Sequence, residues 1–169
     1  MKLPFFLLST AGIVLSSASF CARAASTPVV ESNPAVAVCQ AARSANEGSL
    51  RKRPKAVQNE GTTGVFVTCG LHGNGHTSIE DNSKTVVIYL LNIGAAPVTV
   101  SCTAVDASIG DITTTRSSTM APNSVGQIVF VATDVDEQGR WATPAFSCSL
   151  PPGAGIRQLW HRFDQEIGE

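Results

Sequence analysis

The sequence predicts an all-β protein, an antiparallel β-sandwich of roughly six to seven strands. Short runs rich in β-branched and aromatic residues are separated by turn-forming glycine, proline and asparagine. Several of these runs alternate apolar with polar residues, which is the period of a strand that buries one face. Four of the five cysteines lie beyond the first 24 residues, and an even number is typical of a disulfide-held domain. These features indicate an immunoglobulin-like sandwich with a disulfide-tethered N-terminal segment.

Residues 1–24 have the pattern of a secretory signal peptide. Lys2 supplies the positive start, an apolar run follows, and Ala22-Arg23-Ala24 forms a small-residue cleavage site. We expect cleavage after Ala24, which leaves a secreted or periplasmic chain of about 145 residues. Lipid attachment at Cys21 is not expected, because Phe20 stands where lipoprotein sites have a small residue.

The mature chain is expected to consist of an N-terminal extension and loop (25–62) and a β-sandwich domain (63–169). Loss of Lys2 and Arg23 with the leader leaves ten basic against thirteen acidic residues, a net charge of about −3. This charge disfavours nucleic acid and anionic membrane surfaces as partners. No segment after the leader is apolar enough to span a membrane, and no internal repeat is predicted.

The extension begins with residues 25–34, which are rich in Ser, Pro and Asn and are expected to be loose. Residues 35–45 predict either a short helix or an extended segment. The alternation of Val36 and Val38 with alanines does not decide between them. Residues 47–60 predict a polar loop with the basic cluster Arg51-Lys52-Arg53-Pro54-Lys55. Such a cluster is usually a solvated loop, and its alternative role is to dock an acidic partner or to be cut by proteases.

The segment Thr85–Thr103 predicts a β-hairpin, with a turn at Asn92-Ile93-Gly94 and a second strand after Pro97. Its first strand is apolar on both faces, as expected of a strand inside a covered sheet. Its second strand alternates apolar residues with hydroxyl residues. We therefore expect the hairpin to be the inner scaffold, with its apolar faces used for packing.

The other predicted strands lie before and after this hairpin. A strand at 64–71 is followed by a Gly- and Asn-rich loop at 72–82. The hydroxyl-rich run at 111–119 suits an exposed edge strand. Further strands are predicted at 124–132, at 141–150 with a break at Pro144, and from 156 to about 164.

The four remaining cysteines predict two disulfides, and sequence alone allows three connectivities. Cys102 and Cys148 both lie on the apolar side of alternating strands, which favours a Cys102–Cys148 bridge across the core. Cys39–Cys69 would then tie down the N-terminal segment. Metal ligation by these thiolates is disfavoured, because the chain has no C-x-x-C pair and is expected in an oxidising compartment.

Three stretches together resemble a group of small secreted bacterial proteins of unknown function. They are VTC at 67–69, VTVSCT at 98–103 and CSLPPGAGI at 148–156. The resemblance implies a two-disulfide β-sandwich from about Val65 to Glu166. It implies no catalytic residue and no function.

Three histidines are candidate metal ligands. His72 and His76 flank Gly73-Asn74-Gly75 in the predicted loop, and His161 lies in the last strand. If the strand approaches the loop, three imidazoles can bind zinc or copper, with Glu80 or Asp81 as a fourth ligand. The alternative is a glycine-rich surface loop with solvated imidazoles, because glycines leave such a site poorly preorganised.

The last predicted strand carries Trp160, His161, Arg162 and Phe163 in succession. Because successive strand residues point to opposite faces, two of these four must face away from the core. An exposed aromatic there, with Trp141 and Tyr89 as further candidates, would mark a binding surface of the kind that stacks on sugar rings. The alternative is that these aromatic side chains pack in the core.

The acidic stretch Asp134-Val135-Asp136-Glu137-Gln138-Gly139 is a weaker candidate, for calcium. It lacks the bidentate acid that closes a full calcium loop, and an acidic turn explains it as well. No G-x-S-x-G elbow is present, and oxidation of the cysteines leaves no free thiol for nucleophilic catalysis. A carboxylate pair cannot be placed from sequence, so a glycosidase stays an open alternative that no motif supports. The sequence thus predicts no enzyme and no cofactor.

The function predicted from sequence is a secreted or periplasmic, non-enzymatic binding module for an unknown protein or glycan. The expected contact residues are listed here: Trp160, His161, Arg162, Phe163, His72, Asn74 and His76. One alternative is an inhibitor that inserts the His72–His76 loop into the active site of a secreted enzyme. The other is a metal-binding protein or metal-dependent enzyme that uses His72, His76 and His161.

Overall fold

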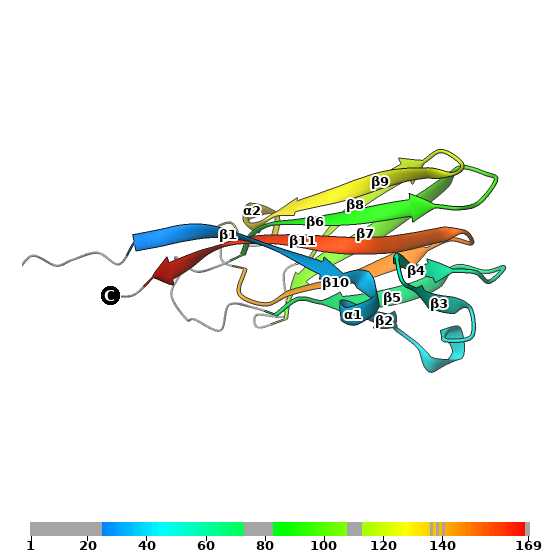
Figure 1. Ribbon diagram of the computed structural model, residues 1–169, viewed down its shortest axis with the longest axis horizontal. Helices are drawn as coiled ribbons and strands as arrows, with labels where there is room; N and C mark the ends of the chain where they lie inside the picture. Colours follow the sequence, from blue (N-terminus) through cyan, green and yellow to red (C-terminus); the bar gives the residue numbers. More distant parts are fainter. Residues whose placement is uncertain are drawn as a thin grey trace, which may run out of the picture.

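The computed structural model describes residues 25–72, 83–107, 113–135, 137, 139 and 141–167. They form an antiparallel β-sandwich of two facing sheets, as the sequence predicts (Figure 1). Within this part of the chain, no helix has the length and apolar character needed to cross a membrane.

Sheet A has six strands and sheet B has five. The sheet A strands are β1 (Ala25–Pro34), β3 (Leu50–Arg53), β4 (Ala56–Asn59), β6 (Ser83–Asn92), β9 (Ser124–Val131) and β11 (Ala154–Ile167). The sheet B strands are β2 (Cys39–Ala41), β5 (Val65–Gly70), β7 (Val98–Asp106), β8 (Thr113–Met120) and β10 (Pro144–Leu150). Three single turns complete the described elements: α1 (Ala35–Val38), η1 (Ser44–Asn46) and α2 (Ala132–Val135).

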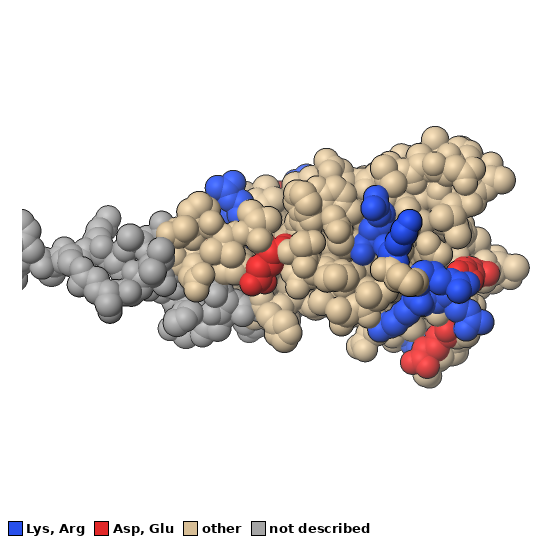
Figure 2. Space-filling view, viewed as in Figure 1, with Lys and Arg blue, Asp and Glu red and all other residues tan. Residues whose placement is uncertain are grey.

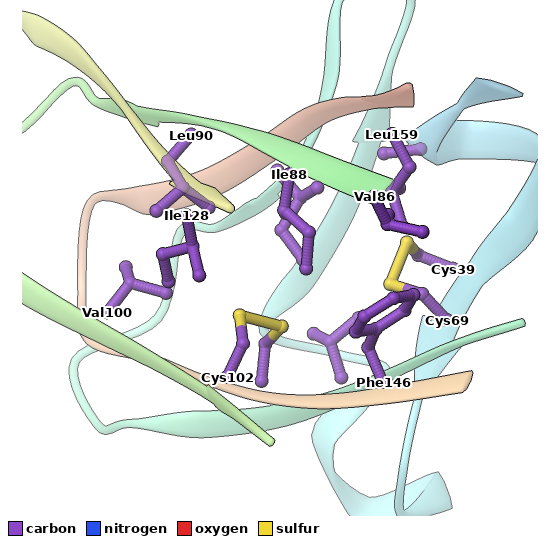
Figure 3. Packing of buried hydrophobic residues seen from close by; sticks show 14 of the residues in the cluster. Cys39, Cys69, Val86, Ile88, Leu90, Val100, Cys102, Ile128, Phe146 and Leu159 are labelled. Atoms are coloured by element: carbon purple, nitrogen blue, oxygen red, sulfur yellow. A yellow bond between two sulfur atoms is a disulfide. The ribbon is translucent and has the colours of Figure 1, made fainter. Parts of the chain in front are cut away.

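The core lies between the sheets and is built by strand alternation. In β5, Val65, Val67 and Cys69 are buried while Phe66 and Thr68 are exposed. Side chains from both sheets meet in this layer, as for Phe130 of β9 and Phe146 of β10, whose ring centroids are 5.5 Å apart. Figure 3 shows Ile88 and Ile128 of sheet A facing Cys102 and Phe146 of sheet B. Burial of these apolar side chains is the main favourable contribution to folding.

Both disulfides have the predicted pairing, Cys39–Cys69 and Cys102–Cys148. The prediction that Cys102–Cys148 crosses the core is wrong. Each bridge joins neighbouring strands of sheet B, because its two cysteines are direct register partners, with Cα–Cα distances of 4.1 and 4.0 Å. The sulfurs lie on the inner face of that sheet (Figure 3). Disulfides persist in oxidising compartments, which supports the expected export.

The expectation of a loose N-terminus is wrong. Residues 25–34 form β1, which pairs with β11 from Ala25↔Ile167 to Pro34↔Gln158. The backbone hydrogen bonds of the β11 edge explain this order, because they can hold a segment that has few apolar residues. Residues 25–62 also supply β2, β3 and β4, so the strands outnumber the predicted six to seven.

The prediction of a β6–β7 hairpin is also wrong. Strand β6 pairs with β11 and β9 in sheet A, whereas β7 pairs with β10 and β8 in sheet B. The connection is therefore an arch from one sheet to the other. Asn92 replaces the hairpin hydrogen bonds: its amide donates to the carbonyls of Ala96 (2.8 Å) and Ala121 (2.9 Å), and its Oδ1 accepts from Gly94 N–H (2.8 Å).

A second arch, from β4 to β5, is built in the same way. Asn59 donates to the carbonyls of Thr63 and Leu150, both at 2.8 Å, and accepts from Gly61 N–H at 3.0 Å. Both asparagines are buried. The two arches read NEGTTGVFVTC at 59–69 and NIGAAPVTVSC at 92–102, sharing N-x-G-x-x-x-V-x-V-x-C. The expectation of no internal repeat is therefore wrong.

A candidate binding face on the outer side of sheet A

Strand β11 presents Trp160 and Arg162 to the outer side of sheet A. Both side chains are exposed, whereas Leu159, His161 and Phe163 are buried toward sheet B. The expectation that two of the four bulky residues 160–163 face away from the core is confirmed. The structure separates the predicted contact residues, because His161 and Phe163 lie on the opposite side of the sheet from Trp160.

A register shift in β11 decides which two residues face outward. The pairing with β6 is irregular between Ile156 and Gln158, so Arg157 is an extra residue in the ladder. Ile156 is fully buried, and unbroken alternation from it would bury Trp160 as well. The bulge reverses the phase and turns Trp160 outward.

Trp160 is held from one side by Tyr89 of β6. Their ring centroids are 5.1 Å apart and their planes are inclined at 64°, an edge-to-face contact. Such a contact limits the motion of the indole without covering it. Trp160 keeps 42% of its surface exposed, an unusual exposure for so large an aromatic side chain.

A shallow groove of about 180 Å³ runs beside Trp160. Three neighbouring strands line it, and the lining residues are Val30 of β1, Thr85 and Val87 of β6, and Trp160 and Arg162 of β11. Cross-strand register explains the grouping, since Arg162 lies opposite both Val30 and Thr85, and Trp160 lies opposite Val87. The groove thus has an apolar floor, one hydroxyl and one guanidinium.

The outer side of sheet A continues onto β9, where valines alternate with buried residues around one exposed amide, Gln127. Val129 is the register partner of Val87, and Val131 is that of Thr85. Val125 is 65% exposed and Val131 is 38% exposed. In Figure 2, where sheet A faces the reader, the surface over β9 carries no acidic or basic colour. We name the outer side of sheet A around Trp160, from β1 to β9, the aromatic face.

No sequence pattern predicts Val30, Thr85 or Val87 at this surface. The sequence predicts hairpin packing for Val87 and Thr85 and a loose terminus around Val30. The alternation of β6 contains a usable signal, because Tyr89, Val87 and Thr85 follow each other at every second position. What the sequence lacks is the order of strands that places β1 and β6 on the two sides of β11.

His161 is a buried polar residue and not part of the aromatic face. Only 1% of it is exposed, and its Nε2 is 2.7 Å from Ser83 Oγ, while its Nδ1 has no partner among the described residues. Burial lowers the pKa of His161 from 6.5 to about 4, because the charged imidazolium loses its hydration. The imidazole is therefore neutral near neutral pH.

This lowered pKa predicts a stability that decreases in acid. Between pH 6.5 and about 4 the unfolded chain binds a proton at His161 that the folded chain does not bind. The free energy of unfolding should therefore have its full value above pH 6.5. It should fall by about 3 kcal/mol as the pH is lowered through this window. Urea unfolding of the wild type and of His161→Gln at several pH values measures the effect. A difference between the two that does not vary with pH would contradict the prediction.

The other candidate metal ligands do not assemble with His161 in the described part of the chain. His72 is exposed at the end of β5, and His76 and Asn74 lie outside the described residues. Among the described residues, no three His, Cys, Asp or Glu side chains are grouped as metal ligands. The inhibitory loop predicted at 72–76 also lies mostly outside the described residues.

Asp134, the first residue of the candidate calcium loop, is engaged in packing α2 against the sheets. Its Oδ1 is 2.6 Å from Arg116 Nη2 and its Oδ2 accepts from Val131 N–H at 2.9 Å. Asp136 and Gln138 lie outside the described residues.

Trp141, a candidate for aromatic stacking, is fully buried and donates from Nε1 to Val105 O at 3.1 Å, so it is a core residue.

The basic cluster Arg51–Lys55 forms the exposed β3–β4 hairpin instead of the predicted loop. Arg53 donates to both carboxylate oxygens of Glu60 at 2.8 Å, which lowers the pKa of Glu60. Lys52 Nζ lies 3.2 Å from Val36 O. Basic colour gathers over these strands at the lower right of Figure 2. This patch is distinct from the aromatic face.

No protein-family model and no curated protein matches the chain. Among solved structures, it is similar to exo-β-1,3-galactanase from Phanerochaete chrysosporium with galactose, at 11% identity and a TM-score of 0.38, over 83% of this chain and 30% of that one. It is also similar to TmCBM61 in complex with β-1,4-galactotriose, at 7% identity and a TM-score of 0.33, over 81% and 84% of the two chains. These likenesses assign no function, and the resemblance to small secreted bacterial proteins stays a prediction.

Proposed function

We propose that this protein is an exported, non-enzymatic binding module that recognises a glycan through the aromatic face. The observation that carries the proposal is the half-exposed Trp160, which Tyr89 holds beside a groove with an apolar floor. A folded chain normally buries such an indole, so a surface that keeps it exposed is suited to a ligand.

The groove combines the two kinds of group that a sugar ring requires. One side of a pyranose ring carries apolar C–H groups. Their removal from water is favourable when they stack on an indole. The rim of the sugar ring carries hydroxyl groups, which must find hydrogen-bond partners when they are buried. Thr85 can donate or accept such bonds, and Arg162 can donate several.

The lining of the groove favours binding over hydrolysis. Glycoside hydrolysis ordinarily uses two carboxyl groups on either side of the bond to be cut. The five residues that line the groove include one guanidinium and one hydroxyl and no carboxylate. A bound glycan would therefore meet groups that orient it and no group suited to protonating it.

A glycan array probed with the mature protein tests the proposal, followed by titration of any hit. The two tryptophans make the titration site-specific, because Trp141 is buried and Trp160 is exposed. We expect a saturable change in tryptophan fluorescence that is retained in Trp141→Phe and absent from Trp160→Phe. Absence of any glycan ligand, or binding that leaves Trp160 fluorescence unchanged, would contradict the proposal.

A protein partner is the second candidate, favoured by the exposed valines that extend the aromatic face over β9. Val131 is the register partner of Thr85 and so lies at the edge of the groove, whereas Val125 pairs with Leu91, further along β9. A sugar in the groove would leave Val125 uncovered, and a broad protein partner would cover both regions. Loss of binding in Val125→Asp, with Trp160 intact, would favour this candidate over the glycan.

A further inference from the structure

Strand β1 is attached to the sandwich in a way that differs from every other described strand. Each of the other ten strands buries at least one side chain. In β1, none of the side chains described, at residues 27–34, is buried. Of the two valines of β1, Val30 is 61% exposed and Val29 is half-buried. The strand is therefore held mainly by its backbone hydrogen bonds to β11.

Loss of β1 would uncover a long edge of β11. Strand β4 pairs with β11 only at Gly155 and Ile156, so from Gln158 onward β1 is the strand that covers this edge. At the far end, beyond the Phe163↔Ser83 pair, β11 continues to Ile167 with β1 as its paired strand. The two strands project from the body together (Figure 1). An uncovered edge of this length can pair with another strand.

The chain immediately after β1 is firmly anchored. Ala35, the first residue of α1, is fully buried, and Cys39 is tied to Cys69. Separation of β1 from β11 would therefore need a backbone change only around Pro34–Ala35 and leave the disulfides and core in place. The predicted cleavage after Ala24 would make Ala25 the free end of the strand. A terminal strand can leave β11 without passing through any other part of the chain.

We propose that β1 exchanges between copies of this protein, so that β1 of one copy pairs with β11 of another. The exchanged strand makes the same ten register pairs, from Ala25↔Ile167 to Pro34↔Gln158, that it makes within one chain. Identical contacts in both states mean that protein concentration sets the balance between them. Val30 of the second copy would then complete the groove beside Trp160.

Cross-linking between two single-cysteine variants of the full mature chain tests this exchange. Thr27 and Gln165 are exposed register partners, so Thr27→Cys and Gln165→Cys place thiols side by side when strands pair. One variant is labelled with ¹⁵N, the two are mixed, and a short bismaleimide is added. The native cysteines are in disulfides and do not react. We expect labelled–unlabelled cross-linked dimers whose yield rises with protein concentration and mixing time.

Two controls decide the outcome. Thr27→Cys mixed with Val125→Cys, whose thiol is exposed on β9, measures chance collisions, and we expect at least ten-fold fewer dimers there. The double variant Thr27→Cys/Gln165→Cys, cross-linked within one chain in dilute solution, should no longer exchange. Mixed-dimer yields equal to the Val125→Cys control, while the double variant cross-links efficiently, would overturn the proposal. This result does not depend on whether a glycan binds the aromatic face.

Discussion

Replacing Trp160 by alanine should weaken ligand binding by at least about 2 kcal/mol, which is roughly 30-fold in dissociation constant. Trp160 is the largest side chain that lines the groove, and Tyr89 holds it in position before a ligand arrives. Such a preorganised, half-exposed aromatic is the kind of residue that dominates an interface. Trp160→Phe should retain part of the affinity, because a smaller ring still stacks. Isothermal titration with the best ligand from the array measures both changes.

Phe66→Ala is the matched control for this substitution. Phe66 is an aromatic residue with 52% exposure on the outer side of sheet B, so its loss removes a similar exposed ring from the opposite face. We expect Phe66→Ala to bind like the wild type. Trp160→Ala should remain folded but unfold with a loss of about 2–4 kcal/mol, because both the buried part of the indole and the Tyr89 contact are removed. Equal affinity of Trp160→Ala and the wild type would rule out the aromatic face as the binding site.

Replacing Asn92 by alanine should lower the free energy of unfolding by about 3–4 kcal/mol. The substitution leaves the carbonyls of Ala96 and Ala121 and the N–H of Gly94 without the partner that the asparagine side chain provides. Each buried polar group left unpaired costs about 1–3 kcal/mol. Asn92→Asp is expected to be no better, because an ionised carboxylate can accept from Gly94 but cannot donate to the two carbonyls. Urea unfolding monitored by circular dichroism measures the loss.

Two further variants test whether the arch is the cause. Asn59→Ala removes the corresponding side chain of the β4–β5 arch and should cost a similar free energy, because it removes three similar hydrogen bonds. Gln40→Ala removes an amide from an exposed position of β2 and should change stability by less than about 0.5 kcal/mol. If Asn92→Ala is no more destabilising than Gln40→Ala, the side chain does not hold the arch.

Much of the local structure follows from the residues alone. The period of two predicts which residues of β5 and β7 are buried, since the folded sheets place Val65, Val67, Val100 and Cys102 inside. The hydroxyl residues of β8 predict an edge strand, and β8 is at the edge of sheet B. The cysteine pairing is predicted because both Cys102 and Cys148 have to occupy the apolar side. These are short-range properties that neighbouring residues encode.

Strand pairing is harder to predict, because it depends on contacts far apart in the chain. The run after Asn92 fits a hairpin and an arch equally well by composition. The arch forms because both β6 and β7 bury apolar side chains between the two sheets. The side chain of Asn92 supplies hydrogen bonds to the backbone carbonyls at the turn. In the same way, β1 lacks the apolar alternation of a strand and forms one only because the β11 edge offers hydrogen-bond partners.

The sequence by itself determined an all-β sandwich with two disulfides and a last strand whose bulky residues must divide between core and solvent, and it favoured the observed disulfide pairing among three. The tertiary structure alone decided that Trp160 and Arg162 are the ones turned outward. The physical reason is the bulge at Arg157, which shifts the strand by one residue relative to β6 and so exchanges its two faces. It also decided that Val30 and Thr85 flank them, because β1 and β6 pair with opposite edges of β11.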